Sequence, residues 1–449
     1  MNEQRNATGR LHRADWGAAV ALLAFCGMAL LSHTKPSIRL GSFFALIGLA
    51  WMGVLASWWC AGGLADKPLL RRIWIWAALF RLVGFLGNPI LEDDYFRYLW
   101  DGRVFATTGN PYASKPADFF QEENLPERFR QILDNVNHPD TPTIYGPLCE
   151  VMFLLGYWIA PGQLWPIKLL LLLADLVTLR LLLNLASPRN VFLYALCPLV
   201  IQETAFTAHP DSLGVMFLVA ALVACHRKSW NGLAVCLALG TGAKVFTLMF
   251  TPFLLWRSPL KSWLLFGGVL VAVYGPFVFQ SNAGGSAGLA AMLQGWEFNS
   301  TGYAALRLVL GPAGAKMACA LLLAAFGFVY FRNWIDLASR SGASGSEVQS
   351  LSLPRGDWIF GMFFVLSPVV NPWYLLWLLP FVVSRPTAAG VTVLIVVSVA
   401  YAHGLNIGSE SLGAYEHPAW VRPVEITAVL LALGWDLRRR LAHLKRNRD

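Results

Sequence analysis

Apolar runs separated by short polar breaks are the dominant pattern along this chain. The runs are about 15–22 residues long, close to the length of helix that crosses the ~30 Å hydrocarbon core of a bilayer. Because water is missing at that depth, the backbone must satisfy its own hydrogen bonds, as a helix does. The pattern therefore predicts an all-α polytopic membrane protein with about 12–14 transmembrane or re-entrant helices.

Basic or Gly/Pro-rich breaks bound the individual runs and give the expected segments. These are 16–31, 43–61, 73–86, 166–186, 191–206, 211–225, 233–243, 245–256, 264–279, 315–331, 358–370, 373–383, 388–403 and 424–437. Residues 148–160 form a shorter, interrupted run, for which we expect a re-entrant or interfacial helix.

Basic residues at the ends of the runs predict the orientation. Arg5, Arg10 and Arg13 precede the first run, so the positive-inside rule places the N-terminus in the cytoplasm. After three spans the chain lies on the extracytoplasmic side, where a long polar segment begins at residue 87. Long loops on a helical scaffold commonly carry function. The expected organisation is N-terminal helices at 1–86, an extracytoplasmic catalytic loop with interfacial helices at 87–147, a transmembrane bundle at 148–437 with a Ser/Gly-rich cytoplasmic linker at 332–355, and a basic cytoplasmic tail at 438–449.

Composition and charge agree with this class and exclude others. Of 449 residues, 56% are hydrophobic and 14% charged, whereas about a quarter are charged in soluble proteins. The net charge of +9 comes from basic residues scattered at segment ends, which are topology signals and not a nucleic-acid surface. The seven cysteines contain no CxxC pair, so neither a disulfide framework nor a metal site is indicated.

The polar stretch opens with three adjacent acids, Glu92, Asp93 and Asp94, followed by an amphipathic pattern that ends at Gly109. One interpretation is that the acids complement the dipole of an interfacial helix and pair with Arg97. One acid would suffice for that, and three repel one another, which raises the pKa of at least one carboxyl and suits a general base. We favour the base. Three adjacent acids on a helix do not converge easily on one ion, although a divalent metal there stays open.

Other polar motifs interrupt the apolar sequence at the expected outer ends of helices. His209 and Asp211 form a functional turn or merely a capped hairpin, and Lys244 either binds an anion or extends to the interface. Tyr145 lines a site or anchors the interface. The last group, Asn371, Trp373 and Tyr374, forms either an aromatic belt or a sugar-stacking surface. Irregular polar backbone at membrane depth lines cavities, so these motifs together predict a polar chamber open to the outer leaflet.

The quoted motifs carry a resemblance to a known class of enzyme. "EDDYFRYLWDGRVFATTGNPY", "NHPDTPTIYGPL", "AHPDSLGV", "GAKVFTLMFTPFLLW" and "SPVVNPWYLLWLLPF" occur in family order between Leu91 and Phe381. The chain resembles the bacterial polyprenol-phosphate-mannose-dependent mannosyltransferases and, more distantly, the catalytic subunit of GPI mannosyltransferase I. Both belong to the GT-C class of membrane glycosyltransferases. Relatives commonly read GHND where this chain has Ala208 to Asp211, and IYPP where it has Ile144 to Pro147.

The resemblance implies a GT-C-like bundle in a bacterial inner membrane, with the active site facing the periplasm or exterior. It also implies that the acidic motif supplies the catalytic base, and this motif maps onto Asp93 and Asp94, with Asp93 preferred. The acceptor would be a hydroxyl of a glycan or lipid.

Physical reasoning on the residues leads to the same chemistry. An outward-facing site has no nucleotide sugars, so an activated sugar there would be held on a membrane lipid through a phosphate. The resemblance implies that this donor is a polyprenyl-phosphate hexose, with mannose expected. Phosphate is a competent leaving group once its charge is stabilised, and a single displacement inverts the anomeric carbon. The expected ligands of the donor phosphate or sugar are Arg97, Arg103, His209, Asp211, Lys244 and Tyr145, and further sugar or acceptor contacts are Glu92, Asn371, Trp373 and Tyr374.

No cofactor is expected beyond the lipid-phosphate sugar, which is a substrate. Two other functions remain open. A lipid-sugar flippase would use the same chamber without forming a glycosidic bond, and a sugar-binding or assembly subunit would need only the aromatic residues. The acid triad favours chemistry over both.

Overall fold

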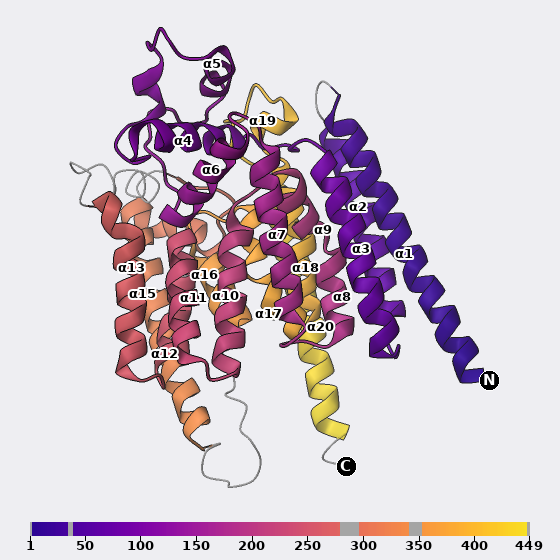
Figure 1. Cartoon of the computed structure of the whole chain (residues 1–449). Coiled ribbons are helices and arrows are strands. Elements are labelled where there is room, and N and C mark those ends of the chain that lie inside the picture. Colours follow the sequence, from indigo (N-terminus) through magenta and orange to yellow (C-terminus); the bar gives the residue numbers. More distant parts are fainter. Residues whose placement is uncertain (1, 35–38, 279–295, 341–352, 447–449) are drawn as a thin grey trace.

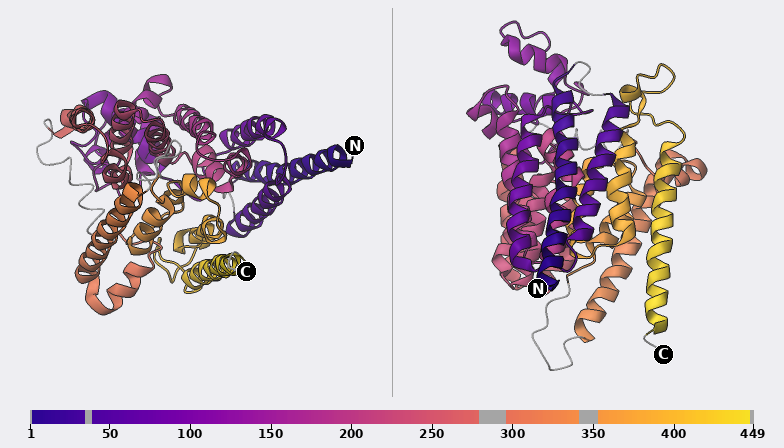
Figure 2. Two further views of the ribbon diagram at one scale, coloured as in Figure 1. Left: turned by 90° about the horizontal axis from the view of Figure 1, so that it is seen from below. Right: turned by 90° about the vertical axis from the view of Figure 1, so that its right-hand side faces the viewer.

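The computed structural model describes residues 2–34, 39–278, 296–340 and 353–446, and the described chain is helical. Within those ranges the only strand-like pairing is one isolated bridge between Phe298 and Val369. Both termini lie at one end of the helix bundle, and the segment from residue 87 to 146 lies at the opposite end (Figures 1 and 2). The expected all-α polytopic membrane protein is confirmed.

Three long helices form the N-terminal edge of the bundle: α1 (Asn2–Ser32), α2 (Leu40–Cys60) and α3 (Asp66–Leu86). Small residues bring α1 and α2 into close contact. A Cβ atom added to Gly17 would lie 2.6 Å from the backbone oxygen of Gly53, so glycine is required at this crossing. The three predicted N-terminal spans are therefore helices in the structure.

The polar stretch folds into short helices at the end away from the termini. It contains α4 (Tyr95–Thr108), the 3-10 turn η1 (Pro116–Phe119) and α5 (Glu127–Asp134), and it re-enters the bundle through α6 (Pro147–Ile159). As predicted, α4 ends at Gly109, which adopts a φ of 77° and donates its N–H to the oxygen of Phe105. Helix α4 packs tightly on α6.

The remaining helices form the body of the bundle. They are α7 (Trp165–Leu182), α8 (Pro188–Leu196), α9 (Pro198–Val200), η2 (Ile201–Phe206), α10 (Asp211–His226), α11 (Trp230–Ala243), η3 (Val245–Phe250), α12 (Thr251–Leu255), α13 (Leu260–Val278), α15 (Gly302–Arg340), α16 (Gly356–Leu366), η5 (Pro372–Leu376), α17 (Leu379–Ser384), α18 (Ala388–Val396), η6 (Val397–Tyr401), α19 (Gly404–Ile407) and α20 (Val421–Arg446).

Length and composition divide the described helices into two groups. Four are long and apolar enough to cross a membrane, at Gly9–Ser32, Leu40–Cys60, Leu260–Val278 and Gly302–Asp336. The shorter apolar helices lie between them in the bundle, and several are interrupted by proline. Proline lacks an N–H and clashes with the preceding turn, so the expected span at 191–206 is broken at Pro198 into α8, α9 and η2.

Two of the expected segment boundaries fall within helices. The first part of the linker expected at 332–355 is the end of α15, because Trp334 packs its ring against Phe253 and Trp256. Residues 341–352 of that linker lie outside the described residues. Residues 438–446 of the tail expected at 438–449 are the end of α20, where basic residues favour a helix C-terminus, and residues 447–449 lie outside the described part of the chain.

A buried ion pair joins the N-terminal helices to the bundle. Arg81 of α3 lies with its Nε 2.5 Å from Oδ2 of Asp175 of α7, and the two side chains are 3% and 0% exposed. Tyr194 of α8 donates its hydroxyl to Oδ1 of the same carboxylate. Charged groups at membrane depth persist when they are paired in this way.

Candidate active site

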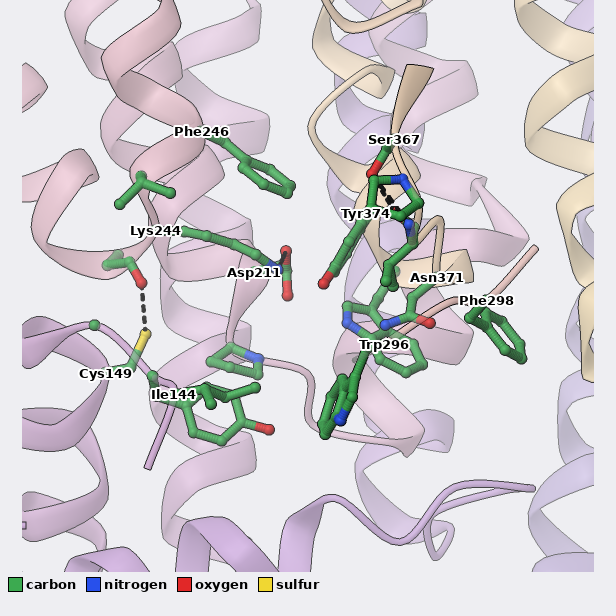
Figure 3. Close-up of a pocket in the computed structure, with 18 of the residues that line it drawn as sticks. Ile144, Cys149, Asp211, Lys244, Phe246, Trp296, Phe298, Ser367, Asn371 and Tyr374 are labelled. Atoms are coloured by element: carbon green, nitrogen blue, oxygen red, sulfur yellow. Dashed lines mark hydrogen bonds and ion pairs between the residues drawn. The ribbon is translucent and has the colours of Figure 1, made fainter. Parts of the chain in front are cut away.

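A large cavity of about 960 Å³ lies in the bundle, and each of the polar motifs singled out in the sequence contributes at least one residue to its wall. Figure 3 shows part of this wall, with Asp211, Lys244, Asn371 and Tyr374 among the labelled residues. The prediction that these motifs share one chamber is therefore confirmed. Of the predicted site residues, those that line the cavity are Glu92, Asp94, Tyr145, Asp211, Lys244, Asn371, Trp373 and Tyr374. The lining does not include Asp93, Arg97, Arg103 or His209.

The acidic segment lies in the turn before α4, and Asp94 occupies the N-cap position without a capping hydrogen bond to its side chain. Carboxylate oxygens of Glu92, Asp93 and Asp94 all lie within 4.8 Å of one another. The expectation that these acids do not converge easily is wrong, because it assumed a regular helix, whereas the acids lie in the turn before α4. A set of carboxylate oxygens at this spacing has the chemistry that Mg²⁺, Mn²⁺ or Ca²⁺ prefers.

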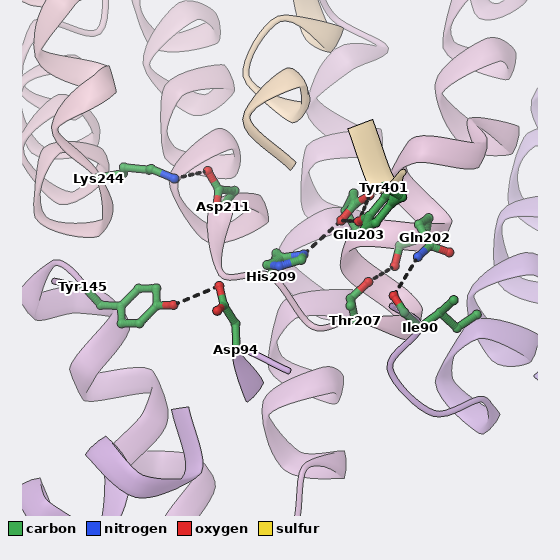
Figure 4. A network of polar contacts seen from close by, with 10 residues as sticks. All are labelled: Ile90, Asp94, Tyr145, Gln202, Glu203, Thr207, His209, Asp211, Lys244 and Tyr401. Atoms are coloured by element: carbon green, nitrogen blue, oxygen red, sulfur yellow. Dashed lines mark hydrogen bonds and ion pairs between the residues drawn. The ribbon is translucent and has the colours of Figure 1, made fainter. Parts of the chain in front are cut away.

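The three acids face different surroundings. Glu92 and Asp94 line the cavity, whereas Asp93 accepts a hydrogen bond from the side-chain amide of Asn137. The hydroxyl of Tyr145 donates to Oδ2 of Asp94 over 3.4 Å (Figure 4). Asp94 is thus the aspartate in contact with the chamber, and Tyr145 orients it.

Burial and crowding both act on this segment. Burial, and then the neighbouring charge of Asp94, raise the pKa of Asp93 to about 6, while the amide of Asn137 opposes the shift. Burial and the charges of Asp94, Glu203 and Asp93 raise the pKa of Glu92 well above its usual range. Carboxyl groups with raised pKa values are expected from the sequence, but burial contributes more than the mutual repulsion that we invoked.

The raised pKa of Asp93 predicts a pH-dependent gain in stability for Asp93→Asn. Between pH ~3.8 and ~6 the folded protein retains the Asp93 proton while the unfolded chain loses it, so wild-type stability falls as pH rises through this window. Asparagine does not titrate and still accepts from Asn137. The Tm of the variant minus that of the wild type is therefore expected to grow from pH 4 to 6 and then level off. Thermal unfolding in detergent measures it, and a difference independent of pH would contradict the shift.

Lys244 and Asp211 form an ion pair across two helices. Lys244 ends α11, where the chain becomes extended, and its Nζ lies 2.6 Å from Oδ1 of Asp211, the first residue of α10 (Figures 3 and 4). Trp377 donates its indole N–H to the same oxygen, and the ammonium lies 3.9 Å from the ring centroid of Tyr374. Lys244 therefore does not extend to the interface; it holds a positive charge on the cavity wall.

His209 lies behind the wall and not on it. Its ring stacks on Trp373 with centroids 3.8 Å apart, and its Nδ1 lies 3.0 Å from Oε2 of Glu203. Tyr401 donates its hydroxyl to both oxygens of Glu203 (Figure 4). The predicted donor ligand His209 is thus placed to fix the ring of Trp373, which does line the cavity.

The two arginines predicted to bind the donor hold the outer segment together. Arg97 donates to both carboxylate oxygens of Asp101 and to the backbone oxygen of Thr141. Arg103 pairs with Glu122 over 3.1 Å. Both arginines are buried, and their charges are neutralised by carboxylates of the protein itself.

Several lining residues were not among the predicted site residues. They are Tyr98, Tyr112, Asn137, His138, Trp296, Glu297, Tyr303, Lys316 and Tyr415. Three of them come from distant segments and meet at His138, whose ring centroid lies 4.7 Å from that of Trp296 and 6.0 Å from that of Tyr415. The available signals were aromatic residues in polar loops and, for Lys316, a single charge inside a long apolar run.

Comparison with known proteins adds one finding. A family model described as alpha-(1->6)-mannopyranosyltransferase, N-terminal domain, matches residues 13–259, which is more than half of the chain. The match contains the acidic segment and both members of the Lys244–Asp211 pair. No curated protein and no solved structure matches the chain.

Proposed function

The chain belongs to the alpha-(1->6)-mannopyranosyltransferase family, and from this membership we propose that it moves mannose from a polyprenyl phosphate to an acceptor hydroxyl. Membership of this family, together with the apolar helices, identifies the chain as a membrane glycosyltransferase that uses mannose. The polyprenyl donor, inversion at the anomeric carbon, an α-(1→6) product linkage and a site open to the outer face of the bacterial inner membrane are parts of the proposal.

The observation that carries the proposal is the composition of one cavity wall. A carboxylate, Asp94, and an ammonium group, Lys244, face the same chamber from different helices, and aromatic rings line the space between the polar motifs. A glycosyl transfer from a phosphate needs a base for the acceptor, a positive charge for the leaving group and a surface for the sugar. The cavity offers all three.

Asp94 is the proposed base, in place of the Asp93 preferred on sequence grounds. Asp94 lines the cavity and receives the Tyr145 hydroxyl, whereas Asp93 is held by Asn137. The acceptor O–H bond breaks as its proton moves to Asp94, and the freed oxygen bonds to the anomeric carbon. The bond from that carbon to the phosphate oxygen breaks in the same step, and the phosphate leaves with the electron pair. Attack opposite to the leaving group inverts the carbon.

The other predicted site residues take supporting roles in this proposal. Lys244 stabilises the phosphate charge, with Asp211 fixing its position. Trp373 stacks on a sugar face, and Asn371 and Tyr374 complete that wall. Arg97 and Arg103 hold the outer segment through their own ion pairs and contact no substrate. Glu92 lies beside Asp94 and binds the acceptor, or with Asp93 and Asp94 a divalent ion.

Transfer in vesicles tests the proposal against the flippase. The purified protein in liposomes receives polyprenyl phosphate carrying radiolabelled mannose, together with an acceptor that ends in a mannose 6-hydroxyl. The expected result is label in the acceptor, in a bond cut by an α-(1→6)-specific mannosidase. Movement of label across the bilayer without a new glycosidic bond would support a flippase and overturn the proposal.

A further inference from the structure

One side of the chamber is apolar and runs along α15. Lys316, Cys319, Ala320 and Leu323 of this helix all line the same cavity as Asp94. They recur every three or four residues and therefore lie on one face of the helix. The wall thus changes from charged to apolar in the direction of the α15 C-terminus.

A second cavity, of about 300 Å³, continues from the first. The two cavities share Met249 and Leu323 as lining residues. The second is lined by Met249, Pro252, Phe253, Leu323, Phe326, Gly327, Phe328, Tyr330, Phe331 and Ile359 and contains no charged group. We call the surface from Lys316 to Phe331, together with Met249 and Phe253 facing it, the α15 track.

The α15 track is long and narrow. From Lys316 to Phe331 the helix rises roughly 22 Å, at 1.5 Å per residue, which is about two thirds of the hydrocarbon core. Towards its far end, Phe253 packs against the rings of Tyr330 and Phe331. A single extended apolar chain fits this shape, whereas a sugar does not fit its chemistry.

Lys316 lies where the polar chamber meets the track. Between Arg307 and Arg332 it is the only charged residue in an otherwise apolar sequence, and a charge within such a span marks function. The order along the cavity wall is polar chamber, lysine and apolar track. A polyprenyl phosphate sugar has the same order: sugar, phosphate and apolar tail.

The track lies on the side of the bundle that lipid can reach. Helices α13 and α15 stand at the edge away from the N-terminal helices (Figures 1 and 2). Only 17% and 11% of their apolar windows are buried within the protein, and Leu308 of α15 is 89% exposed. A lipid-linked substrate can therefore approach this edge from the bilayer.

We propose that the α15 track binds the polyprenyl chain of the donor and that Lys316 contacts its phosphate. The inference rests on the proposed function and adds the place of the donor's tail. The occupant is the polyprenyl chain because the track continues directly from the chamber that holds Asp94 and Lys244. An acyl chain of an ordinary phospholipid is the competing occupant that the test separates.

Gly327→Phe tests the track by filling it. A Cβ atom on Gly327 would meet nothing within 4 Å, so the phenyl ring enters open space in the second cavity, and replacing a helical glycine does not weaken the helix. We expect the ratio of kcat/KM for a long-chain donor to that for a donor of two isoprene units to fall about tenfold, which corresponds to lost burial of roughly two methylene groups.

Gly434→Phe is the matched control. Gly434 is also helical, a Cβ atom there also meets nothing within 4 Å, and it lines neither cavity, so its ratio is expected to stay at the wild-type value.

Lys316→Met should raise KM for both donors, because both carry the phosphate. Equal ratios for Gly327→Phe and Gly434→Phe would overturn the inference and leave the track to another apolar occupant, such as an ordinary phospholipid. Absence of transfer by the wild type from either donor would instead refute the proposed function.

Discussion

Asp94→Asn is expected to lower kcat/KM for mannosyl transfer by about 10²–10⁴-fold, the usual contribution of a general base. Asparagine keeps the size of the side chain and can still accept from Tyr145, but it cannot take the acceptor proton. The fall should be mainly in kcat, since an uncharged amide at this position leaves the cavity shape unchanged. Initial rates at several donor and acceptor concentrations, in detergent or vesicles, measure it.

Asp93→Asn is the matched control, because it makes the same chemical change one residue away. Its side chain does not line the cavity, so we expect a loss of less than about tenfold, well below the range for a base. A larger loss for Asp93→Asn than for Asp94→Asn would return the role of base to Asp93. Equal, severe losses in both would indicate a shared divalent ion, whose ligands act together.

The helices and their shared cavity were predictable because both depend on local patterns. Apolar runs give helices at membrane depth, and alternation of the spans puts the polar motifs at one end of the bundle. The capping glycine Gly109 was predictable for the same reason, because its chemistry is local. These features can be predicted without knowledge of any tertiary contact.

The partners of the charged residues were not predictable in this way. Lys244 has no carboxylate within helical reach along its own helix, and its partner Asp211 comes from another helix that packs beside it. The same holds for His209, whose stacking on Trp373 joins segments more than 160 residues apart in sequence. Tertiary packing decides whether a charge faces a substrate or another side chain.

Backbone conformation also changed the orientation of the motifs. Leu91 and Ala208 have φ values of 59° and 64°, in the left-handed region that non-glycine residues seldom adopt. Each directly precedes a functional segment, so the chain turns abruptly there and re-aims the side chains that follow. Glycine adopts this conformation without strain, whereas the Cβ atom of an alanine is crowded in it. Strain of this kind gathers at functional sites and cannot be read from hydrophobic periodicity.

The Lys244–Asp211 pair allows a structural role and a substrate role to be separated. Lys244→Met leaves the carboxylate of Asp211, which is 2% exposed, without its cation. We expect a loss of about 3 kcal/mol in stability, the lower end of the range for a broken buried pair, because the lysine side chain is 24% exposed. Chemical or thermal unfolding in detergent measures this loss.

The double variant Lys244→Met/Asp211→Asn is expected to recover most of that stability. The asparagine removes the unpaired charge and still accepts from the indole N–H of Trp377. Transfer should remain about 10²–10³-fold below wild type, because the group that stabilises the departing phosphate is missing. If the double variant regained both stability and transfer, Lys244 would serve only to neutralise Asp211, and the phosphate charge would have to be met by Lys316 alone. The cavity wall places both lysines on the same chamber, so the triple variant with Lys316→Met would then abolish transfer.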